Sequence, residues 1–182
     1  VRSGYVNVAN QIARGVDYNF TYQDDFDFGS LRMRLEHTMQ IERKYKLFED
    51  SEENNYVGEL GEPKHTGNVS LTYSKDDYSL TWTTRYVDST NDYEYYNDSK
   101  ETTYQGETVY ATRETRWVTY HSLSGTVDTD MGLKVTAGIA NLFDEEPPIL
   151  SASGTLNVGN AALYSQYDRV GRRFFANVTY SF

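Results

Sequence analysis

The chain has 182 residues, of which 38% are hydrophobic and 15% aromatic, with no cysteine and a formal net charge of -10 at pH 7. Its mean hydropathy is -0.70, and no run approaches the roughly 20 apolar residues that a membrane helix requires, so helical membrane spans are excluded. The missing cysteine excludes disulfides and thiolate metal sites. The acidic charge argues against nucleic acid as a partner, because its phosphates would be repelled.

A membrane β-barrel stays open, because a transmembrane strand needs only about ten residues, half of them apolar. The 17 Tyr and 8 Phe favour this class, since amphipathic aromatic rings concentrate at membrane interfaces, although a Tyr-rich soluble β-protein fits them as well. The chain opens at Val1 without an initiator Met or an apolar signal segment. We therefore expect it to be the remainder of a longer chain.

The first strands are predicted from strict alternation of apolar and polar residues. Residues 1–11 have no clear period, and the alternation begins within residues 13–22. An acidic turn over residues 23–29 leads to a long strand at 31–42. A helix would have mixed the two sets of side chains, because its period is 3.6. One face of the long strand holds Leu31, Met33, Leu35, His37, Met39 and Ile41, and the other holds Arg32, Arg34, Glu36, Thr38, Gln40 and Glu42.

The middle of the chain predicts one hairpin between two long loops. Residues 46–64 are acidic and rich in turn formers, which indicates a loop. Alternation over residues 69–86, interrupted at 75–77, indicates a hairpin with a short connection. A second polar loop covers roughly residues 88–114.

The last part of the chain predicts three more strands. A strand at 115–127 is followed by a short turn at 128–132 and a strand at 133–139. A third long loop, residues 144–168, precedes the closing strand at 169–182. That strand alternates from Gly171 onward and ends on an aromatic residue.

The seven predicted strands are joined alternately by short and long connections, as in outer-membrane barrels with short periplasmic turns and long extracellular loops. A soluble antiparallel sandwich also alternates, but its connections do not usually sort by end. Seven is an odd number, whereas single-chain bacterial barrels have even numbers, so these strands cannot form a complete barrel. The same topology predicts an inner aromatic girdle of Tyr22, Tyr73, Tyr78, Tyr180 and Phe182 and an outer one of Tyr45, Tyr86 and Trp117.

Two segments resemble motifs of TonB-dependent outer-membrane receptors. Residues 141–148 read NLFDEEPP and resemble the "NLFD..PP" segment near the end of these receptors. Residues 167–175 read YDRVGRRFF and resemble the closing "YD..GR.F" strand, which here runs on to Tyr180-Ser181-Phe182. The two motifs occur in the family's order and are separated by a loop, which makes the combined signal strong.

The resemblance implies an all-β, antiparallel transmembrane barrel of about 22 strands, closed by an N-terminal plug domain. Such receptors lie in the outer membrane of Gram-negative bacteria and import scarce nutrients: siderophores, cobalamin, saccharides or peptides. Residues 1–182 would supply the last seven strands, with the plug and earlier strands outside this chain. The implied partners are the rest of the barrel and the plug, the TonB complex, the barrel-assembly machinery, and outer-membrane lipid with lipopolysaccharide. No cofactor is implied.

The closing strand carries a candidate assembly signal, which the insertion machinery would recognise by strand pairing. A role in lipid contact alone explains the same pattern. Pro147 and Pro148 are expected to end a strand, because proline cannot donate a ladder hydrogen bond. Arg172 and Arg173 are expected to lie beside acidic groups of the upper barrel. The candidate signal comprises Gly171, Phe174, Val178, Tyr180 and Phe182.

Two further residue sets are candidates for contacts inside and above the barrel. Arg32, Arg34, Glu36 and Arg85 are expected to face the lumen, where a plug is a better partner than a substrate. Tyr93, Tyr95 and Tyr96 are candidate ligand contacts in an extracellular loop, because aromatic rings stack on sugars and hydrophobic ligands. A girdle or packing role fits these tyrosines equally well.

Catalysis has little support in the sequence. The three histidines, His37, His65 and His121, have no nearby catalytic partners at recognisable spacing, and His37 is expected to pack on the membrane face. Acidic loop clusters lack the ordered spacing of calcium sites, and we predict no catalytic, cofactor or metal residues. Two other functions remain open: a structural or adhesive barrel, and an outer-membrane enzyme with a site built from loops.

Overall fold

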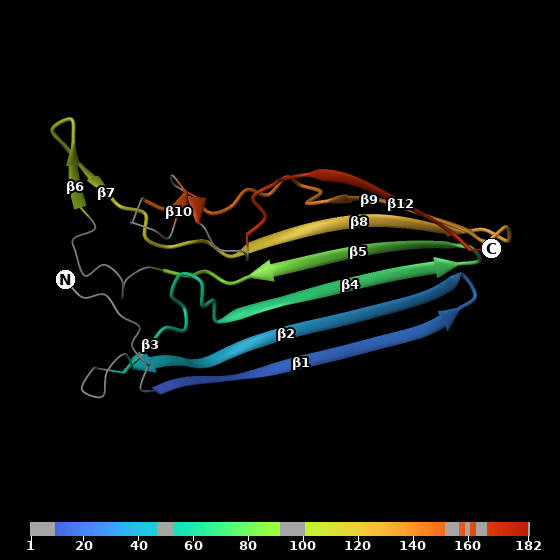
Figure 1. Cartoon of the computed structure of the whole chain (residues 1–182), viewed down its shortest axis with the longest axis horizontal. Helices are drawn as coiled ribbons and strands as arrows, with labels where there is room; N and C mark the ends of the chain where they lie inside the picture. Colours follow the sequence, from blue (N-terminus) through green and yellow to red (C-terminus); the bar gives the residue numbers. More distant parts are fainter. Residues whose placement is uncertain are drawn as a thin grey trace, which may run out of the picture.

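The computed structural model describes residues 10–46, 53–91, 101–151, 157–158, 161–162 and 167–181. All regular structure in these residues is β-strand, and no helix there is long and apolar enough to cross a membrane. One large antiparallel sheet follows the order β1-β2-β4-β5-β8-β9-β12, with β3 added beside β2 (Figure 1). Its main strands are β1 (Asn10–Phe26), β2 (Gly29–Lys46), β4 (His65–Lys75), β5 (Tyr78–Val87), β8 (Val118–Asp128), β9 (Leu133–Ala140) and β12 (Arg173–Tyr180).

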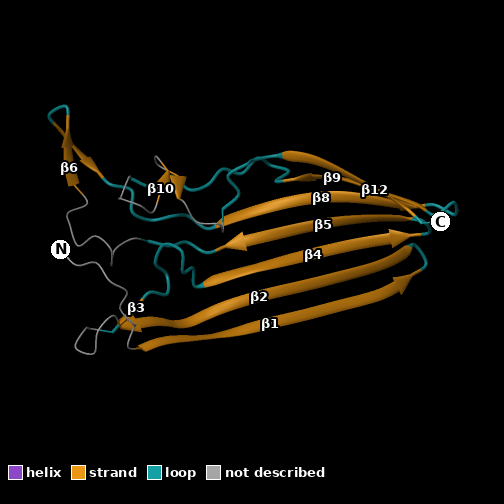
Figure 2. Ribbon diagram, in the orientation of Figure 1, coloured by secondary structure: helices purple, strands orange, loops and turns teal. Residues whose placement is uncertain are grey.

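Short and long connections lie at opposite ends of the sheet, as predicted (Figure 2). The turns at residues 27–28, 76–77 and 129–132 share one end with the C-terminus. The long connections share the other end and carry three small additions. These are β3 (Asn54–Asn55), a hairpin of β6 (Glu101–Tyr104) and β7 (Glu107–Tyr110), and a pair formed by β10 (Asn157–Val158) and β11 (Ala161–Ala162).

The two faces of the sheet differ in polarity along entire rows of paired residues. One row crosses all seven main strands and is wholly apolar or aromatic: Tyr22, Met33, Leu71, Trp82, Leu123, Ile139 and Phe174. The next row lies on the opposite face, because successive side chains in a strand alternate. It is polar: Thr21, Arg34, Ser70, Thr83 and Ser122.

We call the first face outward and the second inward, since the apolar face is the one that lipid would cover. Much of the outward face is exposed: Leu71 is 47% accessible and Phe174 78%. A continuous apolar surface of this kind marks a site of interaction rather than a water-facing exterior.

The first turn is shorter than predicted. Residues 23–26 continue β1, and only Asp27 and Phe28 form the turn, so the predicted acidic turn over residues 23–29 is wrong. Local hydrogen bonds hold this acidic strand end, because Tyr22 donates to Asp24 and Ser30 donates to Asp25. Alternation of hydrophobicity could not reveal a strand end whose charge is satisfied in this way.

A β-bulge in β2 changes the faces near the loop end. The register passes from Gly15 opposite Gln40 to Arg14 opposite Glu42, which leaves Ile41 as the extra residue. A one-residue insertion moves each side chain beyond it to the opposite face of the sheet. Glu42 and Lys44 therefore point outward, and Tyr45 points inward, where its ring stacks on Tyr56 at 4.1 Å. The predicted places of Glu42 on the same face as Arg32, Arg34 and Glu36, and of Tyr45 in the outer girdle, are thus wrong.

Candidate functional site

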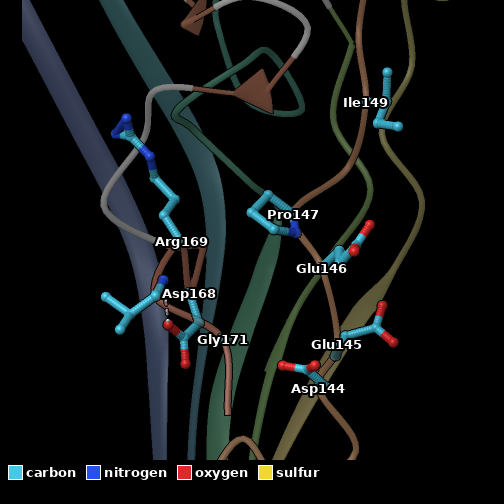
Figure 3. Close-up of a pocket in the computed structure, with 9 residues that line it drawn as sticks. Asp144, Glu145, Glu146, Pro147, Ile149, Asp168, Arg169 and Gly171 are labelled. Carbon is cyan, nitrogen blue, oxygen red and sulfur yellow. Dashed lines mark hydrogen bonds between the residues drawn. The ribbon is translucent and has the colours of Figure 1, made fainter. Parts of the chain in front are cut away.

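The two motif segments meet at the loop end of the sheet, where they enclose a cavity of about 520 Å³ (Figure 3). Asp144, Glu145 and Pro147 come from the first segment, and Asp168 and Gly171 from the second. The sequence shows that the two segments follow each other along the chain, but it does not show whether they touch. The structure shows that they contact each other directly.

Asn141 shapes the first segment. It is 2% exposed and adopts the left-handed conformation (φ 51°), which asparagine tolerates better than most residues. Its side-chain amide donates to the Glu145 carbonyl at 3.0 Å, and its side-chain oxygen accepts from the Glu145 N–H at 2.8 Å. The segment is therefore a closed turn. Because β9 already ends at Ala140, the expectation that Pro147 and Pro148 end the strand is wrong.

Asp144 joins the first segment to the second. Its Oδ1 accepts a hydrogen bond from the Arg172 N–H at 2.7 Å, and its Oδ2 lies 3.6 Å from the Arg172 guanidinium. Gly171 has φ 80°, and a Cβ there would lie 2.9 Å from Asp144 Oδ1. Glycine is thus required both for its backbone conformation and for the close approach of the carboxylate.

Asp168 closes the second segment on itself. Arg173 Nη1 donates to its two carboxylate oxygens at 2.8 and 3.1 Å, and the Val170 N–H donates to Oδ1 at 3.1 Å. Burial pushes the pKa of Asp168 upward, but these hydrogen bonds outweigh it, so the pKa is lowered. The expectation that Arg172 and Arg173 lie beside acidic groups is confirmed, with Asp144 and Asp168 as their partners.

The long connections share a small core that the sequence did not predict. Backbone hydrogen bonds link the first and third connections to the second: the Leu60 N–H donates to the Asn91 carbonyl at 2.7 Å, and the Ser151 N–H donates to the Thr112 carbonyl at 2.9 Å. Within the second connection, the Thr115 N–H donates to the Thr90 carbonyl at 2.7 Å. The buried apolar residues of the described chain all belong to this core: Leu60, Val87, Val118, Tyr120, Leu150 and Tyr167. Periodicity could not find it, because half of its members, Leu60, Leu150 and Tyr167, lie in irregular segments.

A second cavity, of about 550 Å³, opens on the inward face beneath this core. The Arg85 guanidinium lies over the Tyr120 ring, 4.9 Å from its centroid, and no described carboxylate forms an ion pair with Arg85. Tyr120 is 5% exposed. Its hydroxyl has no partner of normal hydrogen-bond geometry among the described residues, although the Asp168 backbone is close enough to act on it. A free cation beside a buried hydroxyl favours an anionic group as the occupant.

The remaining predicted site residues have mixed outcomes. Arg32, Arg34, Glu36 and Arg85 lie on the inward face, and Arg34 makes only a 4.0 Å contact with Glu36 while both stay about half exposed. Phe174, Val178 and Tyr180 point outward from β12, whose second edge pairs with no described strand. Tyr93, Tyr95, Tyr96 and Phe182 lie outside the described residues. Plug contact, ligand contact and assembly signalling stay predictions.

All three histidines lie on the outward face among aromatic rings, near the loop end. The His37 ring is 5.3 Å from that of His65 and 5.9 Å from that of Tyr86. Tyr86 stacks on Trp117 at 5.2 Å, so these two predicted girdle residues do lie together. His121 forms a separate group with Trp82 and Phe143. The sequence placed the histidines on different strands, and only the register shows that His37 and His65 are neighbours.

Comparisons with known proteins identify the fold. No protein-family model matches the sequence, and no curated protein matches it. Two solved structures of the ferric enterobactin receptor PfeA from Pseudomonas aeruginosa, both point mutants and one in complex with enterobactin, superpose with a TM-score of 0.61. They are 20% and 21% identical to this chain, and each match covers 97% of this chain but 23% of the receptor.

PfeA is a TonB-dependent receptor, so the likeness shows the fold of a section of such a barrel. The described sheet is open, as a section of a barrel should be, and it fits the C-terminal portion expected from the motifs. Both neighbours are named as receptors.

Proposed function

We propose that this chain is the C-terminal part of the barrel domain of a TonB-dependent receptor in the outer membrane of a Gram-negative bacterium. The complete protein would take up a scarce nutrient with energy supplied through the TonB complex. One observation carries the proposal: an antiparallel sheet with an apolar outward face, a polar inward face and all its long connections at one end. The contact between the two motif segments at that end supports it.

The inward cavity has a natural occupant in such a receptor. Arg85 and the Tyr120 hydroxyl offer a positive charge and a hydrogen bond toward the space that a plug domain would fill. We assign them, with Arg32, Arg34 and Glu36, to contacts with the plug. A carboxylate of the plug is the group that would satisfy Arg85.

The ligand class is the next step of the proposal. The structural neighbours are ferric enterobactin receptors, so a ferric siderophore is the first class to test. Tyr93, Tyr95 and Tyr96, together with the exposed Tyr104 and Tyr110 of the β6–β7 hairpin, are the aromatic residues that we propose as loop contacts.

The decisive experiment measures uptake of radiolabelled ferric siderophores by cells that express the complete protein. We expect accumulation that stops when the proton-motive force is collapsed and when the cells lack TonB, while binding to the cell surface persists. Binding without energy-dependent accumulation of any siderophore, cobalamin, saccharide or peptide would instead support a structural or adhesive barrel.

The plug assignment has its own test in the complete protein. Reversing Arg34 to Glu, or Arg85 to Glu, should loosen the plug and make it more sensitive to protease, while the barrel still inserts and keeps its heat-modifiable mobility on gels. The matched control is Lys134→Glu, because Lys134 also lies on the inward face but pairs with Asp128 at the turn end. Unchanged protease sensitivity in both Arg variants would count against the assignment.

A further inference from the structure

An outward-facing group of metal-ligand side chains lies where β2 and β4 approach the loop end. It consists of His37 and Met39 on β2 and His65 on β4, with Tyr86 on β5 beside them. All four side chains are half-buried. The group lies just before the bulge at Ile41, beyond which the outward face carries Arg14, Glu42 and Lys44 in ion pairs. It is therefore at the polar margin of the apolar face.

The register brings the three candidate ligands together. Met39 is directly opposite His65, and the neighbouring position is hydrogen-bonded, since the Gln40 N–H donates to the Lys64 carbonyl at 2.9 Å. Met39 and His65 thus occupy a non-hydrogen-bonded pair, where side chains approach each other most closely. His37 is two residues before Met39 on the same face, and its ring is 5.3 Å from the His65 ring at an interplanar angle of 20°.

Tyr86 orients the first of these ligands. The Tyr86 hydroxyl lies 2.5 Å from His37 Nδ1, so that nitrogen is already engaged. With the proton on Nδ1 donated to Tyr86, His37 Nε2 presents its lone pair for coordination, as in many metal sites where a second group fixes the imidazole. Gly67 is opposite His37, and a Cβ there would collide with the Tyr86 hydroxyl, so glycine makes this contact possible.

We propose that His37, Met39 and His65 form a binding site for a single Cu(I) ion, with Tyr86 as the positioning residue. The chemistry of the donor set selects this metal, because a thioether with two imidazoles suits soft Cu(I) rather than hard, oxygen-preferring cations. No group of three or more His, Cys, Asp and Glu residues that could hold a metal ion occurs among the described residues, so the thioether is essential to the set. The site would bind reduced copper at the membrane margin, apart from the lumen.

The test is an anaerobic titration of the complete protein in detergent with Cu(I), using bicinchoninate as the competing chelator. We expect one bound Cu(I) per protein, lost in the Met39→Leu, His65→Gln double variant. Tyr86→Phe should weaken binding by roughly 10–100-fold, the range typical for the loss of a group that orients a ligand. The matched control is His121→Gln, because His121 is an outward histidine whose Nδ1 pairs with Thr84 Oγ1 at 2.9 Å. It should bind like the wild type.

X-ray absorption on the wild-type protein gives a readout that does not depend on a variant folding. One sulfur and two nitrogen scatterers per copper are expected, with the sulfur absent in Met39→Leu. A wild-type spectrum without sulfur, an unchanged titration in the double variant, or an equal loss in His121→Gln would each overturn the proposal. Nutrient uptake should be unaffected in Met39→Leu. Failure of the copper-site proposal can therefore be distinguished from failure of the proposed transport function.

Discussion

The strand body of the sheet and its loop end are built differently. In the body both faces are open, and outward residues such as Leu71 and Leu80 are 47% and 49% exposed. At the loop end Leu60, Leu150 and Val118 are at most 2% exposed, and hydrogen bonds tie the three long connections together. The described part of the body has no core of its own, and in the proposed barrel lipid and the plug domain would supply its burial. The loop end carries a core of its own.

This difference predicts that damage to the core at the loop end stays local. Leu150→Ala should destabilise the packing of the connections by about 2–5 kcal/mol, the usual cost of a buried Leu-to-Ala change. Hydrogen exchange should therefore speed up in residues 56–62, 88–91 and 111–116 but not in β2 or β4. The control is the neighbouring Ile149→Ala, since Ile149 is 65% exposed. Equal effects of the two variants, or faster exchange throughout the strands, would contradict a separate core.

The body should respond to the polarity of each face instead. Leu123→Arg places a charge on the outward face near the middle of β8, where a lipid-facing Arg costs about 2–4 kcal/mol. Ser122→Arg places the same charge on the inward face one residue away and should cost much less. The measurement is urea unfolding of the complete protein in lipid vesicles. If Ser122→Arg were the more damaging variant, the assignment of the two faces would be reversed.

Two glycines, one at the loop end and one in the strand body, allow the two regions to be compared by the same substitution. Gly171→Ala at the loop end should cost about 1–2 kcal/mol, because φ is 80° and the new Cβ would crowd Asp144. Gly125→Ala in the body should be almost neutral, since its Cβ would meet nothing closer than the Ser79 carbonyl at 3.9 Å. Thermal unfolding of both variants in detergent checks this. Similar midpoints for the two would show that Gly171 is not needed for the junction.

The two regions also differ in how well the sequence predicts them. Rows such as Leu71, Trp82 and Leu123 follow from alternation, which depends only on each strand's own residues. The core at the loop end joins Leu60 to Leu150, and these residues lie in segments without a period. At the bulge, Ile41 leaves the alternation of apolar and polar residues along β2 unbroken. The change of face beyond Ile41 can therefore be recognised only from the pairing of β2 with β1. The contact between Asp144 and Arg172 likewise depends on a tertiary approach of two recognisable motifs.

As pH falls, protonation of Asp168 should open the loop end before the strand body is affected. Hydrogen bonds from Arg173 and Val170 keep the pKa of Asp168 below its ordinary value despite burial. A carboxyl with a depressed folded-state pKa stabilises the fold above its unfolded pKa, near 3.9 for Asp, and this contribution is lost as pH falls through the folded pKa. Hydrogen exchange of residues 167–171 should thus be insensitive to this group from about pH 5 to 8 and accelerate below about pH 4.

Asp168→Asn isolates this effect from the other carboxylates at the junction, such as Asp144. The amide cannot titrate, so exchange of the same residues should already be faster near neutral pH and should rise less on acidification. The exchange of β4 and β5 should be the same in both proteins, because neither strand depends on the Asp168–Arg173 pair for its ladder. An acid response of equal size in wild type and Asp168→Asn would assign the opening to another group and leave the Asp168–Arg173 pair without a role in holding the junction.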